Sequence, residues 1–315
     1  MKILFYLKTI YDFKKKNKIG GIEILNIELY NFLKTKFKVS ISNKLNNRHK
    51  KILWDIIISS NYAQIFDIYK SKRNILWLHN KLQIEKAFRK KQLLSILKNK
   101  IDIVFVSKYL ENLTSKLYFF NKRYIIPNFI TNIFVKKKIK LHKNYKPIFV
   151  WTVQRDRGLK ELIHIWEHEI IKKYPLAELH VFSVSGYSNK LNNIFFHGRV
   201  DRLTLVKFYQ KAKAMICLGY DETFCLNAVE SFSQGLPIIS FGKTALTDIV
   251  INNINGHIAN DFKDLKNLIF KYINLKGSKY EKLRLSSFNY SKKFYPNKIF
   301  NMWVDLLKTN IAINK

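Results

Sequence analysis

Two glutamates separated by seven residues, Glu222 and Glu230, carry the most informative spacing in the chain. Both lie where an apolar, strand-like run leads into a helical pattern that we expect to begin at Leu226. The first backbone N–H groups of such a helix have no helical partners, so they suit an anionic diphosphate. These groups belong to Thr223, Phe224, Cys225 and Leu226.

Glu230, one turn further in, can accept hydrogen bonds from the vicinal diol of a ribose, each contributing about 1.5–3 kcal/mol. Glu222, before the helix, would then face a sugar. The plainer alternative is two glutamates on a solvated helix.

Other candidate residues lie at further strand-to-helix junctions. Arg157 precedes Gly158 at one of them, where an arginine can bind a diphosphate through two parallel hydrogen bonds. Gly20 and Gly21 follow the first strand and open a helical pattern, where glycines let backbone amides approach a phosphate closely. His79 stands at the end of another apolar run. The structural alternatives are a tight turn for Gly20 and Gly21, and for His79 a histidine at a strand end whose hydrogen bonds are satisfied within the fold.

The sequence gives little support for a metal or a covalent nucleophile. His164 and His168 share a helix face, but their spacing is not H-E-x-x-H and no third ligand is apparent. No Asp-x-Asp ends a strand. The two cysteines, Cys217 and Cys225, form no C-x-x-C motif and favour a reduced, intracellular compartment. We therefore expect no metal and no cofactor.

These residues must be positioned by strands and helices that alternate along the whole chain. Short apolar runs rich in β-branched residues are typical of strands in a parallel sheet. In the first half we expect strands at Ile3–Leu7, Asp55–Ile58, Ile75–Leu78 and Ile103–Val106, and helices at Gly21–Lys36, Gln83–Lys98 and Lys108–Tyr118. In the second half we expect strands at Ile148–Trp151, Glu178–Phe182, Ile194–His197, Ala214–Leu218 and Pro237–Ser240, and helices at Leu159–Lys173, Arg202–Lys211 and Asn227–Gln234. This alternation predicts an α/β fold with two doubly wound, Rossmann-like domains.

The boundary between the domains is predicted from composition. Residues 131–146 are polar and rich in lysine, which indicates a linker between a domain at 1–135 and a second at 146–297. An apolar, amphipathic stretch at Ile299–Leu307 predicts a helix, within about 298–315, that packs back onto the first domain. Ligands of open α/β sheets bind at the carboxyl ends of the strands, so we expect the site in a cleft there.

The residues around the two glutamates resemble a known family. The pattern E-T-F-C-L-x-A-x-E-x-x-x-x-G-L-P-I-I, which runs from Glu222, resembles the E-x7-E motif of retaining glycosyltransferases of the GT-B fold, glycosyltransferase family 4. In that family the second glutamate binds the ribose of the nucleotide, and the first contacts the donor sugar near its reacting carbon. Glu222 and Glu230 match those positions. The resemblance is strong over 147–257 and weaker over 1–130.

The resemblance also assigns expected roles to the other candidates. Arg157 stands where the family has a phosphate-binding lysine. Thr152 stands where the family has an arginine, so this chain departs from the family at one phosphate contact. Arg155 is a candidate for a second contact, and a solvated loop charge is the alternative for it. The family has a Gly-Gly loop and a histidine at the positions of Gly20-Gly21 and His79, the latter near the reacting sugar. Further similarities are Asn128, which we interpret as structural, and the loop Lys243-Thr244-Ala245-Leu246 beside the donor.

Charge is the remaining clue. The net charge is +35, and residues 1–146 contain 33 Lys+Arg against 8 Asp+Glu, so the first half carries most of the excess. One explanation of the positive charge is a lysine-rich composition alone. The other is that the protein binds an anionic membrane surface through the basic segment Lys81–Lys100. The early lysines exclude a signal peptide, and no apolar run approaches the roughly 20 residues of a membrane helix.

Together these features predict a cytoplasmic, peripheral hexosyltransferase. It would move a sugar, with retention, from a UDP- or GDP-sugar to a glycan or lipid-linked acceptor in cell-surface polysaccharide or lipopolysaccharide synthesis. The alternatives are a sugar-nucleotide epimerase of the same fold and a basic nucleic-acid-binding protein. No RNA-binding motif is found, so nucleic acid is not an expected partner.

Overall fold

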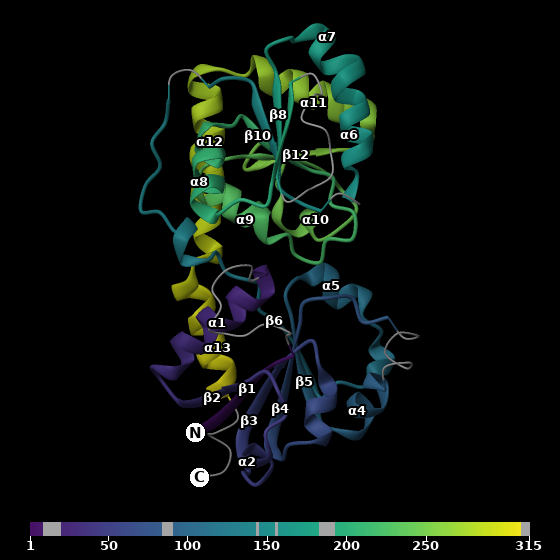
Figure 1. Cartoon of the computed structure of the whole chain (residues 1–315), viewed down its shortest axis with the longest axis vertical. Helices are drawn as coiled ribbons and strands as arrows, with labels where there is room; N and C mark the ends of the chain where they lie inside the picture. Colours follow the sequence, from purple (N-terminus) through teal and green to yellow (C-terminus); the bar gives the residue numbers. More distant parts are fainter. Residues whose placement is uncertain (9–19, 84–90, 143–144, 155–156, 183–192, 310–315) are drawn as a thin grey trace. The chain divides into compact units, whose positions relative to one another are not determined.

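The computed structural model describes residues 1–8, 20–83, 91–142, 145–154, 157–182 and 193–309 (Figure 1). The chain forms two compact units. The first comprises Met1–Phe129 together with Pro296–Lys315, and the second comprises Ile130–Tyr295. The first unit therefore ends before residue 135, the boundary expected from composition. The expected linker begins inside the second unit, because Phe134 is fully buried there against Tyr209, with ring centroids 6.0 Å apart.

The first unit is built on a parallel sheet, six-stranded in the described part of the chain, with the order β2-β1-β3-β4-β5-β6. Its strands are β1 (Lys2–Leu7), β2 (Lys38–Ser42), β3 (Trp54–Ser60), β4 (Ser71–Leu78), β5 (Ile101–Phe105) and β6 (Lys122–Ile125). Its helices are α1 (Gly21–Lys34), α2 (Asn47–Lys50), α4 (Gln92–Lys98) and α5 (Lys108–Leu113), with 3₁₀ turns η1 (Ala63–Asp67) and η2 (Lys116–Tyr118). The inner strands β1, β3 and β5 and the second half of β4 are almost wholly buried, because helices cover both faces of the sheet.

The last helix of the chain, α13 (Pro296–Lys308), belongs to this first unit, as its amphipathic pattern indicated. Trp303 on α13 is fully buried and meets Trp77 of β4 edge-on, with ring centroids 5.0 Å apart. Phe300 stacks on Phe32 of α1 at 4.5 Å. Full burial of each such side chain contributes about 1.5–3 kcal/mol, so α13 completes the hydrophobic core of the first unit.

The second unit repeats the architecture with the strand order β12-β11-β10-β7-β8-β9. Its strands are β7 (Ile148–Trp151), β8 (Glu178–Phe182), β9 (Ile194–Gly198), β10 (Ala214–Cys217), β11 (Ile238–Phe241) and β12 (Gly256–Ala259). Its helices are α6 (Leu159–Ile165), continued by a π-helical turn (Trp166–Ile170) and α7 (Ile171–Lys173), then α8 (Arg202–Lys211), α9 (Leu226–Ser233), α10 (Leu246–Ile249), α11 (Phe262–Asn274) and α12 (Gly277–Ser291). Figure 1 shows α8, α9 and α12 on one face of the sheet and α6 and α11 on the other.

The structure confirms the doubly wound α/β prediction and every expected strand, with ends that differ by up to four residues. Strands β2, β6 and β12 were not expected. The helix expected at Lys108–Tyr118 is divided into α5 and η2, and α4 begins only at Gln92; residues 84–90 of that expected helix lie outside the described residues. Within the described residues, no helix is long and apolar enough to cross a membrane.

Candidate active site

The candidate residues of the second unit gather where the strand order of its sheet reverses. From β7 the chain builds outward through β8 and β9, then returns to place β10 on the other side of β7. The loops after β7 and β10 therefore start from neighbouring strand ends at the carboxyl edge of the sheet. Open α/β sheets bind their ligands at this reversal, because the two loops diverge there and leave room. The loop after β7 contains Arg157 and Gly158, and the loop after β10 contains Glu222.

Arg157 and Glu222 form an ion pair across these two loops. The Arg157 Nη1 atom lies 2.9 Å from Glu222 Oε1 and also donates to the backbone carbonyl of Tyr220 at 2.8 Å. Gly158 makes this approach possible, because its φ is +99° and a Cβ atom there would lie 2.7 Å from Leu218 Cδ1. Both side chains stay partly exposed, at 21% for Arg157 and 15% for Glu222. The pair links the two motifs that the sequence placed 65 residues apart.

Two opposing effects act on the Glu222 carboxyl group. Burial raises its pKa above the usual value, whereas the charge of Arg157 and the backbone N–H of Cys225 lower it, and burial dominates. The loop that carries Glu222 is fixed by its own backbone. The Glu222 N–H donates to the Gly219 carbonyl at 3.1 Å, and the Glu222 carbonyl accepts from the Ala245 N–H at 3.2 Å. Ala245 belongs to the loop after β11 that was expected beside the donor.

Helix α9 begins at Leu226, one residue before the range Asn227–Gln234 that was expected from the alternation of strands and helices. Cys225 is its N-terminal cap and has a left-handed backbone, with φ of 65°. Asn227, in the first turn, donates from Nδ2 to the Thr152 carbonyl at 2.6 Å and so ties the start of α9 to the end of β7. Thr223 and Phe224 precede the cap, and Phe224 is buried against Phe294. The start of α9 therefore lies at the same sheet edge as Arg157 and Glu222, and its Ala228 N–H donates to the Cys225 carbonyl at 3.1 Å.

Glu230 is buried inside the second unit, on helix α9. It is 1% exposed, and its Oε1 accepts from Arg202 Nη1 at 2.7 Å and from Thr131 Oγ1 at 3.2 Å. Burial raises the pKa of the Glu230 carboxyl, and Arg202 and Thr131 oppose that shift. Sequence reasoning found neither partner, since they are 28 and 99 residues away and carry no local signal. Ribose binding by Glu230 stays a prediction. The Glu230 carboxylate that would bind the ribose is already hydrogen-bonded to Arg202 and Thr131.

Thr152 points away from the expected phosphate position. Its hydroxyl accepts from Tyr209 at 3.2 Å and donates to Met215 Sδ at 3.7 Å, and the residue is only 4% exposed. Its side chain is therefore part of the core, and only its backbone reaches the site, through Asn227. Arg155 lies outside the described residues.

Comparison with known proteins agrees with this geometry. Residues 186–289, which contain both glutamates, match the family model "Glycosyl transferases group 1". Over almost the entire chain the fold is that of solved glycosyltransferases with two Rossmann-like domains, the GT-B fold. The chain has the GT-B fold and carries a segment that matches the group 1 glycosyl transferases in its second unit.

Three solved structures show the extent of this similarity. A sucrose-phosphate synthase from Thermosynechococcus elongatus has a TM-score of 0.77 at 16% identity, covering 99% of this chain and 100% of that one. The lipopolysaccharide outer core galactosyltransferase WaaB has 0.70 at 14%, covering 99% and 100%. The pneumococcal O-GlcNAc transferase GtfA, solved with UDP and GlcNAc, has 0.59 at 14%, covering 81% and 56%. No curated protein is a close enough match to count as a relative.

The first unit holds the remaining candidates at the carboxyl edge of its own sheet. Gly20 caps α1 and Gly21 opens it, and the Glu23 side chain folds back over Gly20. His79 follows β4; its backbone N–H donates to Asn61 Oδ1 at 2.7 Å, and the centre of its ring lies 4.3 Å from that of Trp77. Burial lowers the pKa of His79 to about 3, so its imidazole is neutral at physiological pH.

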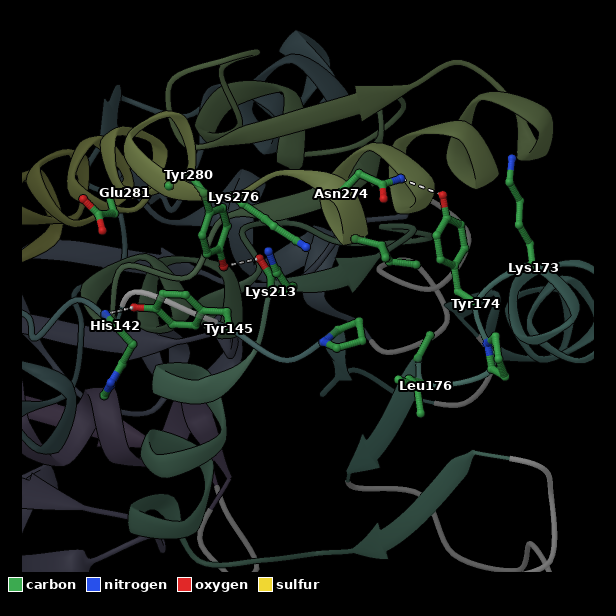
Figure 2. Close-up of a pocket in the computed structure, with 15 residues that line it drawn as sticks. His142, Tyr145, Lys173, Tyr174, Leu176, Lys213, Asn274, Lys276, Tyr280 and Glu281 are labelled. Carbon is green, nitrogen blue, oxygen red and sulfur yellow. Dashed lines mark hydrogen bonds between the residues drawn. The ribbon is translucent and has the colours of Figure 1, made fainter.

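Two cavities accompany these sites. One of about 430 Å³ lies in the first unit, at the reversal of strand order between β1 and β3, and is lined by Lys8, Ser60, Asn61, Tyr62, Gln64 and Gln92. The other, of about 420 Å³, lies in the second unit at the amino ends of β7, β8 and β10 (Figure 2). Its lysines include Lys213, whose pKa falls to about 8 through burial and the nearby charges of Lys276 and Arg284. This second cavity is at the sheet edge opposite the glutamate motif, so it is separate from the candidate active site.

Proposed function

We propose that the protein is a glycosyltransferase that transfers a sugar with retention from a UDP- or GDP-sugar, as in glycosyltransferase family 4. The observation that carries this proposal is the Arg157–Glu222 pair, 2.9 Å apart, at the strand-order reversal and beside the start of α9. A cation and the amides of a helix start at one edge suit a diphosphate, and a carboxylate next to them suits the attached sugar. The UDP in the structure of the pneumococcal transferase GtfA supports a uridine donor.

The proposed roles follow the charge that develops during transfer. As the bond from the anomeric carbon to the diphosphate breaks, negative charge grows on the leaving phosphate and positive charge on the sugar. We propose that Arg157 and the first N–H groups of α9 stabilise the leaving phosphate by preorganised electrostatics. Glu222 orients the sugar and stabilises its positive charge. The acceptor hydroxyl attacks the same face that the diphosphate leaves. The basic site takes the place of a metal, so none is required.

The acceptor is proposed to bind the cavity of the first unit. Asn61, Gln64 and Gln92 offer amide groups to sugar hydroxyls, and Lys8 Nζ lies 4.2 Å from the centre of the Tyr62 ring, which is a surface for a sugar ring. The lysine also suits a phosphate of a lipid-linked acceptor. The similarity of the fold to WaaB supports cell-surface polysaccharide or lipopolysaccharide synthesis as the setting.

A peripheral position on the inner face of the membrane is supported by an apolar surface in the first unit. Helix α4 packs against η2, and the two elements with the residue after η2 expose four large apolar side chains. The exposed fractions are 56% for Leu94, 52% for Leu97, 70% for Leu117 and 74% for Phe119. Lysines flank them at 98, 100, 116 and 122. Apolar side chains surrounded by lysines are typical of surfaces that bind anionic lipid.

The proposal is tested by a donor screen with EDTA present. The protein is incubated with UDP-, GDP- and ADP-linked α-sugars, and the products are followed by NMR. We expect turnover of one nucleotide family, formation of an α-linked product, and loss of turnover in Glu222→Gln. A β-linked product would exclude retention. Conversion of the donor to an epimer without transfer would indicate the epimerase, and salt-sensitive DNA binding without donor binding would indicate the nucleic-acid-binding protein.

A further inference from the structure

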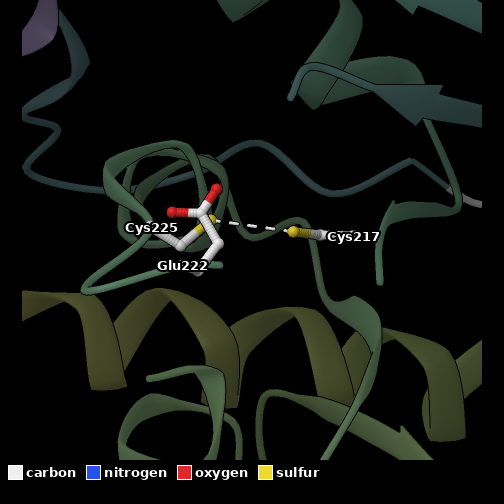
Figure 3. A group of neighbouring side chains, drawn as sticks. All are labelled: Cys217, Glu222 and Cys225. Carbon is white, nitrogen blue, oxygen red and sulfur yellow. Dashed lines mark hydrogen bonds between the residues drawn. The ribbon is translucent and has the colours of Figure 1, made fainter. Parts of the chain in front are cut away.

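Two cysteines and the loop glutamate lie together beside the candidate active site. Cys217 ends β10, Cys225 caps α9, and Glu222 lies in the loop between them (Figure 3). One potential ligand atom from each residue lies within 4.8 Å of the other two, and the sulfur atoms of the cysteines are 3.8 Å apart. Both cysteines are buried and neither is in a disulfide, whereas the Glu222 side chain keeps 15% of its surface exposed. The cluster therefore has a buried sulfur side and an open carboxylate side.

The backbone at Cys225 indicates that its thiol has a role. Its φ of 65° lies in the left-handed region, which glycine adopts freely and other residues adopt at a cost of about 1–3 kcal/mol. A glycine would cap α9 here without that cost. Strain of this kind concentrates at functional sites, which makes the side chain of Cys225 a candidate for a function.

The spacing of the ligand atoms matches a tetrahedral metal ion. Two thiolates at about 2.3 Å from one Zn²⁺ stand about 3.8 Å apart, which is the separation of the Cys217 and Cys225 sulfurs. A carboxylate oxygen on the same ion stands about 3.5 Å from each sulfur, within reach of a rotation of the Glu222 side chain. Two thiolates and one carboxylate leave a Zn²⁺ site with one excess negative charge, and Arg157 beside Glu222 balances it.

We propose that Cys217, Cys225 and Glu222 bind a thiophilic divalent cation such as Zn²⁺, with water in the fourth position. Both thiols release their protons to solvent when the metal binds, and nothing is oxidised. Binding strengthens as pH rises, because the thiols must lose their protons to bind the metal. Bound metal withdraws Glu222 from Arg157 and inhibits transfer. This inhibition rests on the proposed function, whereas the binding does not.

The binding is tested on the reduced, metal-free full chain with Co²⁺ as a spectroscopic probe. We expect one Co²⁺ per chain, with the near-ultraviolet absorption of thiolate bound to cobalt. This absorption is lost in Cys217→Ser and in Cys225→Gly, a variant that suits the left-handed backbone. Glu222→Gln keeps the absorption but binds at least tenfold more weakly. The matched control is His164→Ala/His168→Ala, which removes another close pair of histidines and leaves the absorption unchanged.

Several outcomes overturn the proposal. Wild-type protein without the cobalt–thiolate absorption, or absorption that persists in Cys217→Ser, excludes the site. Disappearance of both free thiols with a mild oxidant, in protein that binds no cobalt, shows instead that the cysteines form a disulfide. Activity is measured separately: Zn²⁺ is expected to lower wild-type transfer at least tenfold, reversibly with EDTA, while Cys217→Ser resists it and Mg²⁺ has no effect. Cobalt binding in a protein that turns over no donor would leave the metal site standing and reject the proposed function.

Discussion

Acidification is expected to destabilise the first unit through His79. Burial lowers its pKa to about 3 in the folded chain, against about 6.5 in the unfolded chain. Between these values the unfolded state binds a proton that the folded state excludes, so stability is present above the unfolded pKa and is lost as pH falls. From pH about 7 to about 5 the two values give a loss of about 2 kcal/mol from this one residue. A neutral buried imidazole also cannot act as a charged acid near pH 7.

The assay for this effect is amide exchange, followed by mass spectrometry on peptides from β4 and α13. Both elements belong to the first unit, and their exchange reports its unfolding. Wild-type protein and His79→Gln are compared at both pH values, because other histidines titrate equally in the two proteins. We expect the wild type to lose about 2 kcal/mol more than the variant on acidification. Equal losses in both proteins would refute the assignment of a depressed pKa to His79.

Three further predictions concern the active site and the membrane surface. Glu222→Gln should lower turnover about 100-fold, or roughly 2.7 kcal/mol, in steady-state kinetics; a loss below about threefold would remove Glu222 from the mechanism. Gly158→Ala should lower the melting temperature more than Gly198→Ala, because both glycines have positive φ but only Gly158 would place its Cβ against neighbouring atoms; equal shifts would contradict the packing argument. Leu117→Ser/Phe119→Ser should reduce flotation with anionic liposomes at moderate salt; unchanged flotation, or none in the wild type, would argue against membrane docking through this surface.

The sequence predicted the inner strands of both sheets, and the strands that it missed share a position. Strands β2, β6 and β12 lie at sheet edges. Inner strands are covered on both faces and appear as continuous apolar runs, whereas β2 has the sequence Lys-Val-Ser-Ile-Ser and β6 has Lys-Arg-Tyr-Ile. Strands β2 and β6 keep polar residues because part of each is exposed to solvent, whereas β12 is a short Gly-His-Ile-Ala segment. Helix α12 was not predicted for another reason. Its buried face includes Arg284, Ser287 and Ser291, so its apolar periodicity is weak.

The residues of the candidate active site were predictable where they lie in short sequence motifs. Arg157 and Glu222 were both found from motifs at strand ends, and the structure brings them to 2.9 Å because β7 and β10 are neighbours. The partners of Glu230 were not predictable, since Arg202 and Thr131 meet it only through the tertiary fold. The inward rotation of the Thr152 hydroxyl was not predictable either, because it depends on packing against another element.

The most direct test of the central claim is nucleotide binding by the second unit's motif. In the full chain with EDTA present, UDP and GDP are titrated while the unfolding temperature is followed. At about 100 times the dissociation constant, binding stabilises the folded state by about 2.7 kcal/mol. We predict stabilisation by one of the two nucleotides in the wild type, and its loss in both Arg157→Gln and Glu230→Gln. No stabilisation by either nucleotide, or stabilisation unchanged in both variants, would contradict a donor site at the strand-order reversal.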